Sequence, residues 1–281
     1  MKPYVRIKFF SNMEILGFFL SSFMVASLLF PMGKIEELIF NAPDFNIELS
    51  EIYLKNLIEV NPNTRLKLAI AQRYIKTGNI EIAYNILGSL RDVKDLDMKR
   101  EALGMVYEIL KWKYLWARDK HQKDYIKRQI ERCVRERLVF IKKEGSLESM
   151  FYELISLDMP NLAMFVAKRY FLIKGKKDVK MLEKLADAFL WQGEYKKSIP
   201  LYEEIISLEK KATKKKRTFK KVVKILMWNK DYKELKRILL KYMPRFFEDE
   251  DLALFCLQIA LSTGDPYFAR NLLLKALKSQ P

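Results

Sequence analysis

The residue types that catalyse reactions or bind metals are scattered along this sequence. The single histidine, His121, lies in a basic segment without a Ser, Cys or carboxylate cluster at a helical spacing that would pair with it. Cys133 and Cys256 lack metal-ligand spacing and lie among apolar residues, which favours buried thiols over a disulfide. No phosphate-binding loop, His-Glu-x-x-His pair or nucleophile elbow occurs. The sequence therefore predicts no enzyme, no cofactor or metal, and no small-molecule substrate.

One acidic run, Glu248 to Asp251, has the residue types of a metal site. It directly precedes an apolar segment that is predicted to be helical. Carboxylates are favourable at the amino-terminal end of a helix dipole. We therefore interpret this run as a helix start.

Basic residues are more distinctive. Lys and Arg total 52 against 35 Asp and Glu, for a formal charge of +17 over 281 residues, and they concentrate in Lys210–Lys221 and Lys111–Lys143. A basic surface favours an anionic partner such as an acidic polysaccharide, a nucleic acid or an acidic lipid surface. Charge-rich surfaces are also typical of thermophile proteins, where ion pairs form networks. Composition leaves both explanations open.

The segment Asp178–Ile206 has the pattern of two amphipathic helices that fold back on each other at Gly193. The first helix repeats apolar residues at steps of three and four, and these are Leu182, Leu185, Ala186, Phe189 and Leu190. The second helix builds a matching stripe with Tyr195, Ser198, Ile199, Tyr202 and Ile205. Gly193 can adopt the left-handed conformation that ends the first helix. The two stripes are predicted to bury each other.

This segment resembles the tetratricopeptide repeat, a helix-turn-helix unit of about 34 residues. Leu185-Ala186, Phe189, Gly193, Tyr195, Ser198 and Tyr202 follow the repeat's skeleton in order, with Ser198 in place of the usual small Ala. Similar units cover Leu66–Leu87, Ser146–Lys174, Thr213–Tyr242 and Glu250–Pro281, and an expanded unit without a turn glycine runs from Met98 to about Glu144. The predicted turn positions are 78, 158, 193, 230 and 264. We predict an all-α fold, a right-handed superhelical solenoid over residues 50–281.

The N-terminal segment has a different composition. Ile15 to Met32 is an uncharged and mostly apolar run, just long enough to cross a bilayer. No small-x-small exit follows it, so we predict an uncleaved transmembrane anchor over residues 13–32 and a linker over 33–49. Lys2, Arg6 and Lys8 precede the run, which places residues 1–12 in the cytoplasm and the repeats in the periplasm of a bacterium. The expected location is the inner membrane.

The resemblance to tetratricopeptide proteins implies a concave groove, lined by the first helix of each repeat, in which partner proteins bind. Carried over by position, the groove residues are Arg65, Gln72, Trp191, Arg217, Lys220, Lys224 and Trp228. Trp191 and Trp228 stand at the same place in successive repeats, two residues before the turn position. The alternative is that both indoles pack against their own turns.

These features predict a membrane-anchored scaffold for protein-protein interactions. The order of anchor, LSEIYLKNLIEVNPNTRLKLAIAQRYIKTGNIEIAYNIL and LADAFLWQGEYKKSIPLYEEII also resembles the repeat region of Pel-type exopolysaccharide export scaffolds. That resemblance implies a role in exopolysaccharide export or another cell-envelope assembly. The alternative is a binder of an acidic polymer, either polysaccharide or nucleic acid, through the basic surface.

Overall fold

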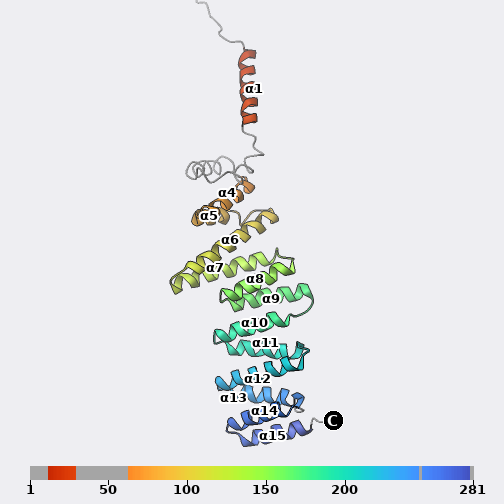
Figure 1. Ribbon diagram of the computed structural model, residues 1–281. Coiled ribbons are helices and arrows are strands. Elements are labelled where there is room, and N and C mark those ends of the chain that lie inside the picture. The colour runs from red at the N-terminus through yellow and green to blue at the C-terminus, as the bar shows by residue number, and fades with distance from the viewer. Residues whose placement is uncertain (1–11, 30–62, 247–248, 279–281) are drawn as a thin grey trace, which may run out of the picture. The chain divides into compact units, whose positions relative to one another are not determined.

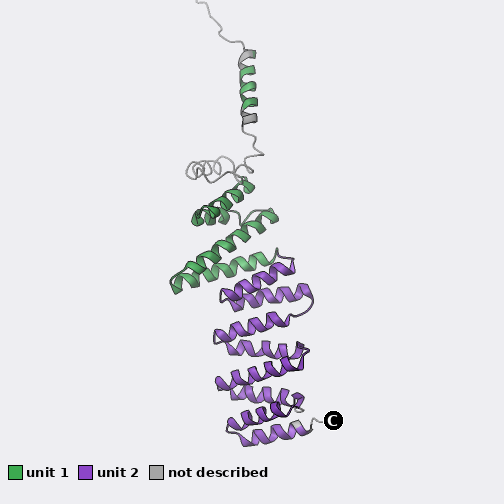
Figure 2. Ribbon diagram, viewed as in Figure 1, with its two compact units in different colours: residues 1–140 green, residues 141–281 purple. Residues whose placement is uncertain are grey.

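A computed structural model describes residues 12–29, 63–246 and 249–278. These residues form helices and their connections, and they contain no strand. The chain divides into two compact units, residues 1–140 and 141–281 (Figure 2). The predicted all-α fold is confirmed. The first residues assigned to the solenoid, 50–62, lie outside the described part of the chain.

The described residues 63–140 of unit 1 form two antiparallel helix pairs (Figure 1). The first pair is α4 and α5, and the second is α6 and α7. Their bounds are Thr64–Lys76, Ile80–Gly88, Leu96–Trp116 and Lys120–Leu138. The expanded unit is therefore present, but its second helix ends at Leu138 rather than near Glu144. Glu144 instead begins the next helix, where its carboxylate lies at the positive end of the dipole.

In unit 2, the residues that the structure describes form four successive helix pairs (Figure 1). The pairs α8/α9 and α10/α11 have the bounds Glu144–Ser156, Pro160–Lys174, Val179–Trp191 and Tyr195–Leu208. The pairs α12/α13 and α14/α15 have the bounds Ala212–Trp228, Tyr232–Tyr242, Glu250–Ser262 and Pro266–Lys278. A short 3₁₀ helix, η3 (Met243–Phe246), follows α13. The basic stretch Lys210–Lys221 thus lies mostly within α12.

All five predicted turn positions have a positive φ angle. Three are glycines, at residues 78, 193 and 264, and the other two are Asp158 (φ 58°) and Lys230 (φ 54°). At Gly193 the amide of Glu194 donates to the carbonyl of Phe189 at 2.9 Å, and the amide of Gly193 donates to the carbonyl of Leu190 at 2.9 Å. This is the Schellman arrangement, which satisfies carbonyls at a helix end. The regular spacing of the repeats thus comes from one turn geometry.

The residues that carry the repeat resemblance form the interface within each pair. In α10 and α11 the side chains of Leu185, Ala186, Phe189, Ser198 and Tyr202 are all buried. Ser198 is the one polar side chain in this set, and its hydroxyl donates to the carbonyl of Tyr195 at 2.8 Å. A buried hydroxyl with a partner avoids the desolvation penalty of an unpaired one. Ser can therefore take the place of Ala.

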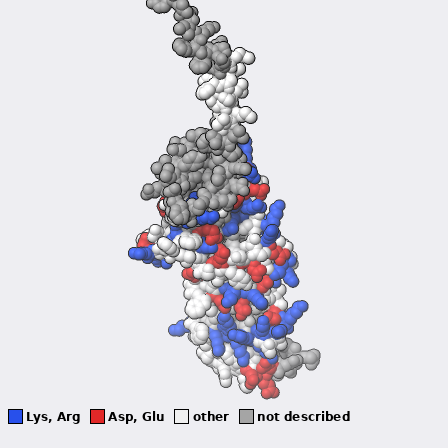
Figure 3. Space-filling view, turned by 45° about the horizontal axis from the view of Figure 1, so that its top comes forward, with Lys and Arg blue, Asp and Glu red and all other residues white. Residues whose placement is uncertain are grey.

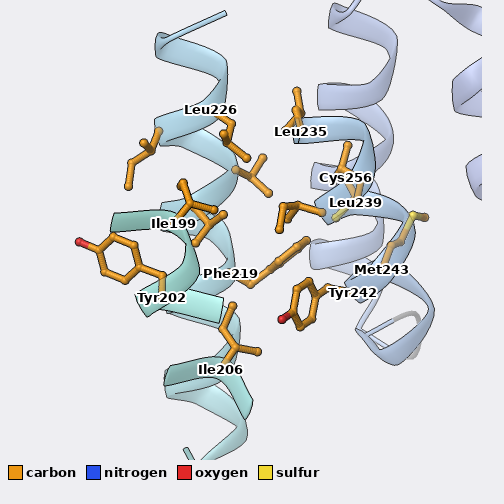
Figure 4. Packing of buried hydrophobic residues seen from close by; sticks show 14 of the residues in the cluster. Ile199, Tyr202, Ile206, Phe219, Leu226, Leu235, Leu239, Tyr242, Met243 and Cys256 are labelled. Atoms are coloured by element: carbon orange, nitrogen blue, oxygen red, sulfur yellow. The ribbon is translucent and has the colours of Figure 1, made fainter. Parts of the chain in front are cut away.

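Large apolar side chains continue the core from one pair to the next. Phe219 of α12 is fully buried, with its ring centroid 5.9 Å from that of Tyr242 and 5.5 Å from that of Phe246. Figure 4 shows Phe219 surrounded by side chains from α11, α12, α13, η3 and α14, including Ile199, Leu239 and Cys256. Because no single helix pair could bury this surface, the pairs of unit 2 depend on one another for stability.

The N-terminal helix α1 spans Asn12–Leu29. Its described apolar side chains are exposed, and they include Phe18, Phe19 and Phe23. Among the residues that the structure describes, no helix meets the length and hydropathy that crossing a membrane requires. The transmembrane segment 13–32 is therefore not supported. Its last residues, the predicted linker 33–49 and most of the predicted cytoplasmic segment 1–12 lie outside the described residues.

Candidate partner-binding groove

The groups with catalytic potential remain separate in the structure. His121 is exposed at the start of α7. Cys133 and Cys256 are free and buried, which confirms their interpretation as core thiols. Burial raises the pKa of each thiol to about 12. Both are therefore neutral at physiological pH and are poor nucleophiles.

The acidic run contributes a helix cap. Asp249 precedes α14 and accepts a hydrogen bond from the amide of Leu252 at 3.0 Å. Its pKa is lowered by a hydrogen bond from the ammonium of Lys216 and by this backbone bond. Glu250 and Asp251 lie in the first turn of α14, whereas Glu248 lies outside the described residues. For Asp249–Asp251 the interpretation as a helix start is confirmed.

Trp191 and Trp228 occupy equivalent positions at the ends of α10 and α12. Each is the last residue of its helix and directly precedes a Schellman turn. Trp191 is 89% exposed and Trp228 is 78% exposed. The alternative in which both indoles pack against their own turns is therefore wrong. Two large aromatic surfaces at equivalent positions are left open to solvent, and such residues often anchor interfaces.

A groove of about 640 Å³ runs along α12 in unit 2. We call it the α12 groove. It is lined by Leu190, Thr213, Lys216, Arg217, Lys220, Lys221, Lys224, Ile225 and Trp228. Leu190 belongs to α10, and the other residues belong to α12. Their three- and four-residue spacing places them along one face of that helix. Basic side chains thus form most of one wall, and Trp228 stands at the carboxyl end of that wall.

Two of the five cations are neutralised by carboxylates. Lys216 pairs with Asp249, and Lys221 Nζ lies 2.5 Å from Oδ1 of Asp187 in α10. The other three, Arg217, Lys220 and Lys224, make no ion pair with any carboxylate in the described part of the chain. Lys220 lies 5.6 Å from the ring centroid of Phe255, and Arg217 and Lys224 are exposed. The groove therefore carries uncompensated positive charge.

Asp187 holds the groove wall to the core. It accepts hydrogen bonds from the Tyr202 hydroxyl of α11 and from Lys221 of α12, so it connects three helices. The Lys221 ammonium also lies 4.8 Å from the Tyr202 ring centroid. Burial and the hydrogen bond to Asp187 raise the pKa of Tyr202, which stays protonated as a donor. This network orients Lys221 and fixes the spacing of α10 and α12.

The structure brings together only some of the predicted groove residues. Arg217, Lys220, Lys224 and Trp228 line the α12 groove, whereas Trp191 is not among the lining residues. Arg65 and Gln72 lie on α4 in unit 1, where Arg65 is exposed and Gln72 is partly buried. Sequence reasoning included Lys216 and Lys221 in the basic stretch Lys210–Lys221 but not among the groove residues, and it did not predict Leu190, Thr213 or Ile225. The three- and four-residue spacing of the basic residues indicates that Lys216 and Lys221 share the groove face. The contribution of Leu190 depends on how the helices pack, which the sequence does not show.

Figure 3 shows Lys and Arg side chains spread over one face of the molecule, with Asp and Glu between them. Some of these basic side chains form surface ion pairs. Arg237 of α13, for example, pairs with Glu203 at 2.5 Å and with Glu234 at 2.6 Å. Such pairs fit the explanation by ion-pair networks for part of the basic composition. In the α12 groove, three cations without an ion pair lie together along one helix face.

No family model matches this chain, and no curated protein matches it. Among solved structures, the chain is similar to one in the crystal structure of the APC/C hetero-tetramer Cut9-Hcn1, with 13% sequence identity and a TM-score of 0.31. The match covers 83% of this chain and 44% of that chain. This chain thus spans less than half the length of that one, and a similarity of this extent assigns no function.

Proposed function

We propose that this chain is a helical-repeat scaffold and that the α12 groove binds an acidic segment of a partner protein. The observation that carries the proposal is the charge state of the groove. Arg217, Lys220 and Lys224 share one helix face and make no ion pair with a described carboxylate, although Asp249 attracts Lys220 at longer range. Asp or Glu side chains of a bound segment would supply the missing charges.

The start of α12 gives independent support. Lys214, Lys215, Lys216 and Arg217 lie in its first two turns, and its first turn contains no acidic residue. Cations at the amino-terminal end of a helix oppose the helix dipole. Two carboxylates offset part of this charge, since Glu209 lies 3.9 Å from Lys214 and Asp249 pairs with Lys216. An anionic ligand would offset the rest.

Trp228 favours a protein over a polymer as the ligand. It adds a broad apolar surface at the end of the basic wall, where it suits an aliphatic or aromatic side chain next to the acidic residues. A uniformly charged polymer would use the cations but would gain less from the indole. The acidic-polymer alternative depends on the same three cations, so the contribution of Trp228 separates the two proposals.

The test uses the full chain and a fluorescent peptide in which Asp and Glu flank a central Phe-Leu pair. Binding is measured by anisotropy, with alginate as the polymer competitor. Changing Arg217, Lys220 and Lys224 to Gln should weaken peptide binding by about 10- to 100-fold, if each charged contact contributes about 0.5–1 kcal/mol. Trp228→Ala should weaken it by about 30-fold, as expected of an aromatic anchor.

A matched control changes Lys168, Arg169 and Lys275 to Gln. These exposed residues of α9 and α15 carry the same total charge and do not line the α12 groove. The control should retain peptide binding. Equal losses in the control and in the groove variant would mean that net charge alone drives binding. Tight alginate binding that Trp228→Ala leaves unchanged would favour an acidic polymer over a protein as the ligand.

For the location of the chain, we propose attachment to the inner membrane through residues 13–32, with the repeats in the periplasm. The support is the apolar run, the basic residues before it and the exposed apolar side chains of α1. Reporter fusions at Lys34 and Pro281 should be active only as periplasmic reporters, and cytoplasmic activity at both would overturn the topology. A role in exopolysaccharide export rests on sequence resemblance, and a polymer-modifying enzyme that co-purifies with the scaffold would support it.

A further inference from the structure

A second surface with unexplained chemistry lies at the end of the α6/α7 pair in unit 1. We define the α6–α7 tip as Lys111–Tyr125, which comprises the end of α6, the connection and the start of α7. Within this fully described range Ala117 is the one buried residue. The buried positions of α6 end at Leu110, and those of α7 begin at Ile126. The tip therefore extends beyond the hydrophobic core of unit 1.

The tip exposes apolar side chains that the core does not need. Trp112 is 55% exposed and Trp116 is 78% exposed, and their ring centroids lie 6.5 Å apart. Leu115 is also exposed, and its position three residues after Trp112 and one before Trp116 places all three on adjoining parts of the helix surface. Exposure of two indoles and a leucine to water is energetically unfavourable. The cluster therefore indicates a partner that covers it.

Basic residues surround this cluster. The tip contains Lys111, Lys113, Arg118, Lys120 and Lys123 but only two acidic residues, Asp119 and Asp124. Asp119 is engaged as the cap of α7, where it accepts from the amide of His121 at 2.7 Å and from that of Gln122 at 3.1 Å. Lys113 pairs with Glu81 at 2.8 Å, whereas Arg118 and Lys120 are exposed and make no ion pair with a described carboxylate. Lys127 and Arg128 extend the exposed basic surface along α7.

We infer that the α6–α7 tip docks on an anionic lipid surface. Tryptophan side chains accumulate at the headgroup level of bilayers, and Leu115 can enter the acyl region below them. Arg118, Lys120 and Lys123 would then face the anionic headgroups. A nucleic acid would also attract the cations and could stack on the indoles, but Leu115 offers no surface for base stacking. The combination of an aliphatic and two aromatic side chains at a basic helix end suits lipid best.

This docking is independent of the α12 groove, which belongs to unit 2. It also differs from an anchor at residues 13–32, because a tip that rests on the surface needs no membrane-spanning helix. Each cation near an anionic surface contributes about fivefold to binding. Loss of three cations should therefore shift the equilibrium between bound and free tip by about 100-fold.

The four tryptophans of the chain allow a direct test. In the full chain carrying Trp191→Phe and Trp228→Phe, only Trp112 and Trp116 remain to report on the tip. The protein is added to vesicles of equal parts phosphatidylcholine and phosphatidylglycerol, in which the phosphatidylcholine has brominated acyl chains that quench tryptophan. We expect a blue-shifted emission, quenching by the brominated lipid, and loss of both effects at high salt.

The matched control is the full chain with Trp112→Phe and Trp116→Phe. It keeps Trp191 and Trp228, and its emission should not be quenched. Changing Arg118, Lys120 and Lys123 to Gln in the reporter chain should abolish most of the quenching, whereas changing Lys168, Arg169 and Lys275 to Gln should not. Circular dichroism checks that each variant keeps its helix content.

Three results would overturn the inference. In the first, iodide in solution reaches the tip tryptophans equally well with and without vesicles. In the second, quenching is equal in vesicles of phosphatidylcholine alone, which would exclude selection of anionic lipid. In the third, a single-stranded oligonucleotide changes the emission while the vesicles do not, which would assign the tip to nucleic acid. Any of these can be observed whether or not the α12 groove binds an acidic peptide.

Discussion

The Nζ atom of Lys221 lies 2.5 Å from the Oδ1 atom of Asp187, and this ion pair joins α12 to α10 at a residue that lines the α12 groove. Lys221 is thereby held against the wall, while Arg217, Lys220 and Lys224 remain available to a ligand. The two side chains are 40% and 33% exposed. Their contribution to stability is therefore that of a partly solvated pair, and their main effect is to set the geometry of the groove.

A double-mutant cycle measures this pair. Asp187→Asn and Lys221→Gln should each destabilise the full chain slightly, with a coupling free energy of about 0.5–1 kcal/mol from urea unfolding. Asn can still accept from the Tyr202 hydroxyl, so the cycle isolates the ion pair. The coupling should shrink in 1 M NaCl, where the Debye length is about 3 Å. A coupling of zero at low salt would mean that the pair is open in solution.

Two substitutions at equivalent turn positions should change the free energy of unfolding in opposite directions. Gly193→Ala should destabilise the chain by about 0.5–1 kcal/mol, because a side chain at φ 74° is strained although no atom lies within 4 Å of the new Cβ. Lys230→Gly should stabilise it by a similar amount, because Lys230 has φ 54° at the equivalent turn. Urea unfolding of both variants is the check. Effects of the same sign would contradict the shared turn geometry.

Glu203 of α11 should make stability depend on pH. Its carboxylate accepts from Arg237 at 2.5 Å and from Lys241 at 2.7 Å. Burial opposes ionisation, but these two cations outweigh it and hold the pKa of Glu203 below its ordinary value of 4.5. Because the folded-state pKa is the lower one, the stabilisation is complete above pH 4.5 and is lost as the pH falls through the folded-state pKa.

Glu203→Gln should therefore cost about 1 kcal/mol at pH 7, since it leaves Lys241 without a charged partner, whereas Arg237 keeps its ion pair with Glu234. The difference in the free energy of unfolding between wild type and variant should disappear on acidification toward about pH 2, where both side chains are neutral. Urea unfolding across this range, followed by circular dichroism, is the measurement. A difference that stays constant with pH would show that the carboxylate contributes packing or hydrogen bonding but no charge.

Ala186 tests the packing within a repeat. It is fully buried between α10 and α11, so Ala186→Phe should overpack the pair and cost about 1–3 kcal/mol. Lys184→Ala, at an exposed position of the same helix, should stay within about 0.5 kcal/mol of wild type. An Ala186→Phe variant as stable as wild type would mean that α10 and α11 pack differently.

The sequence by itself determined the helix pairs and their turns. Apolar residues at three- and four-residue spacing define which face of each helix is buried, and this depends only on local periodicity. Even the turns without glycine, at Asp158 and Lys230, were predicted, because turn-forming residues interrupt the apolar pattern there. The buried state of Cys133 and Cys256 and the capping role of Asp249 were likewise local, because each depends on the residues next to it.

Tertiary structure alone decided which of the charged and aromatic residues could act together. Sequence spacing placed Trp191 and Trp228 at equivalent positions, but only the packed helices show that both indoles remain exposed. Sequence spacing also could not show which cations of α12 are neutralised. The partners of Lys216 and Lys221 are Asp249 and Asp187, which lie 33 and 34 residues away in the sequence. Arg217, Lys220 and Lys224 have no such ion pair. Whether a basic side chain is neutralised or free depends on contacts between helices, and helical periodicity carries no information about them.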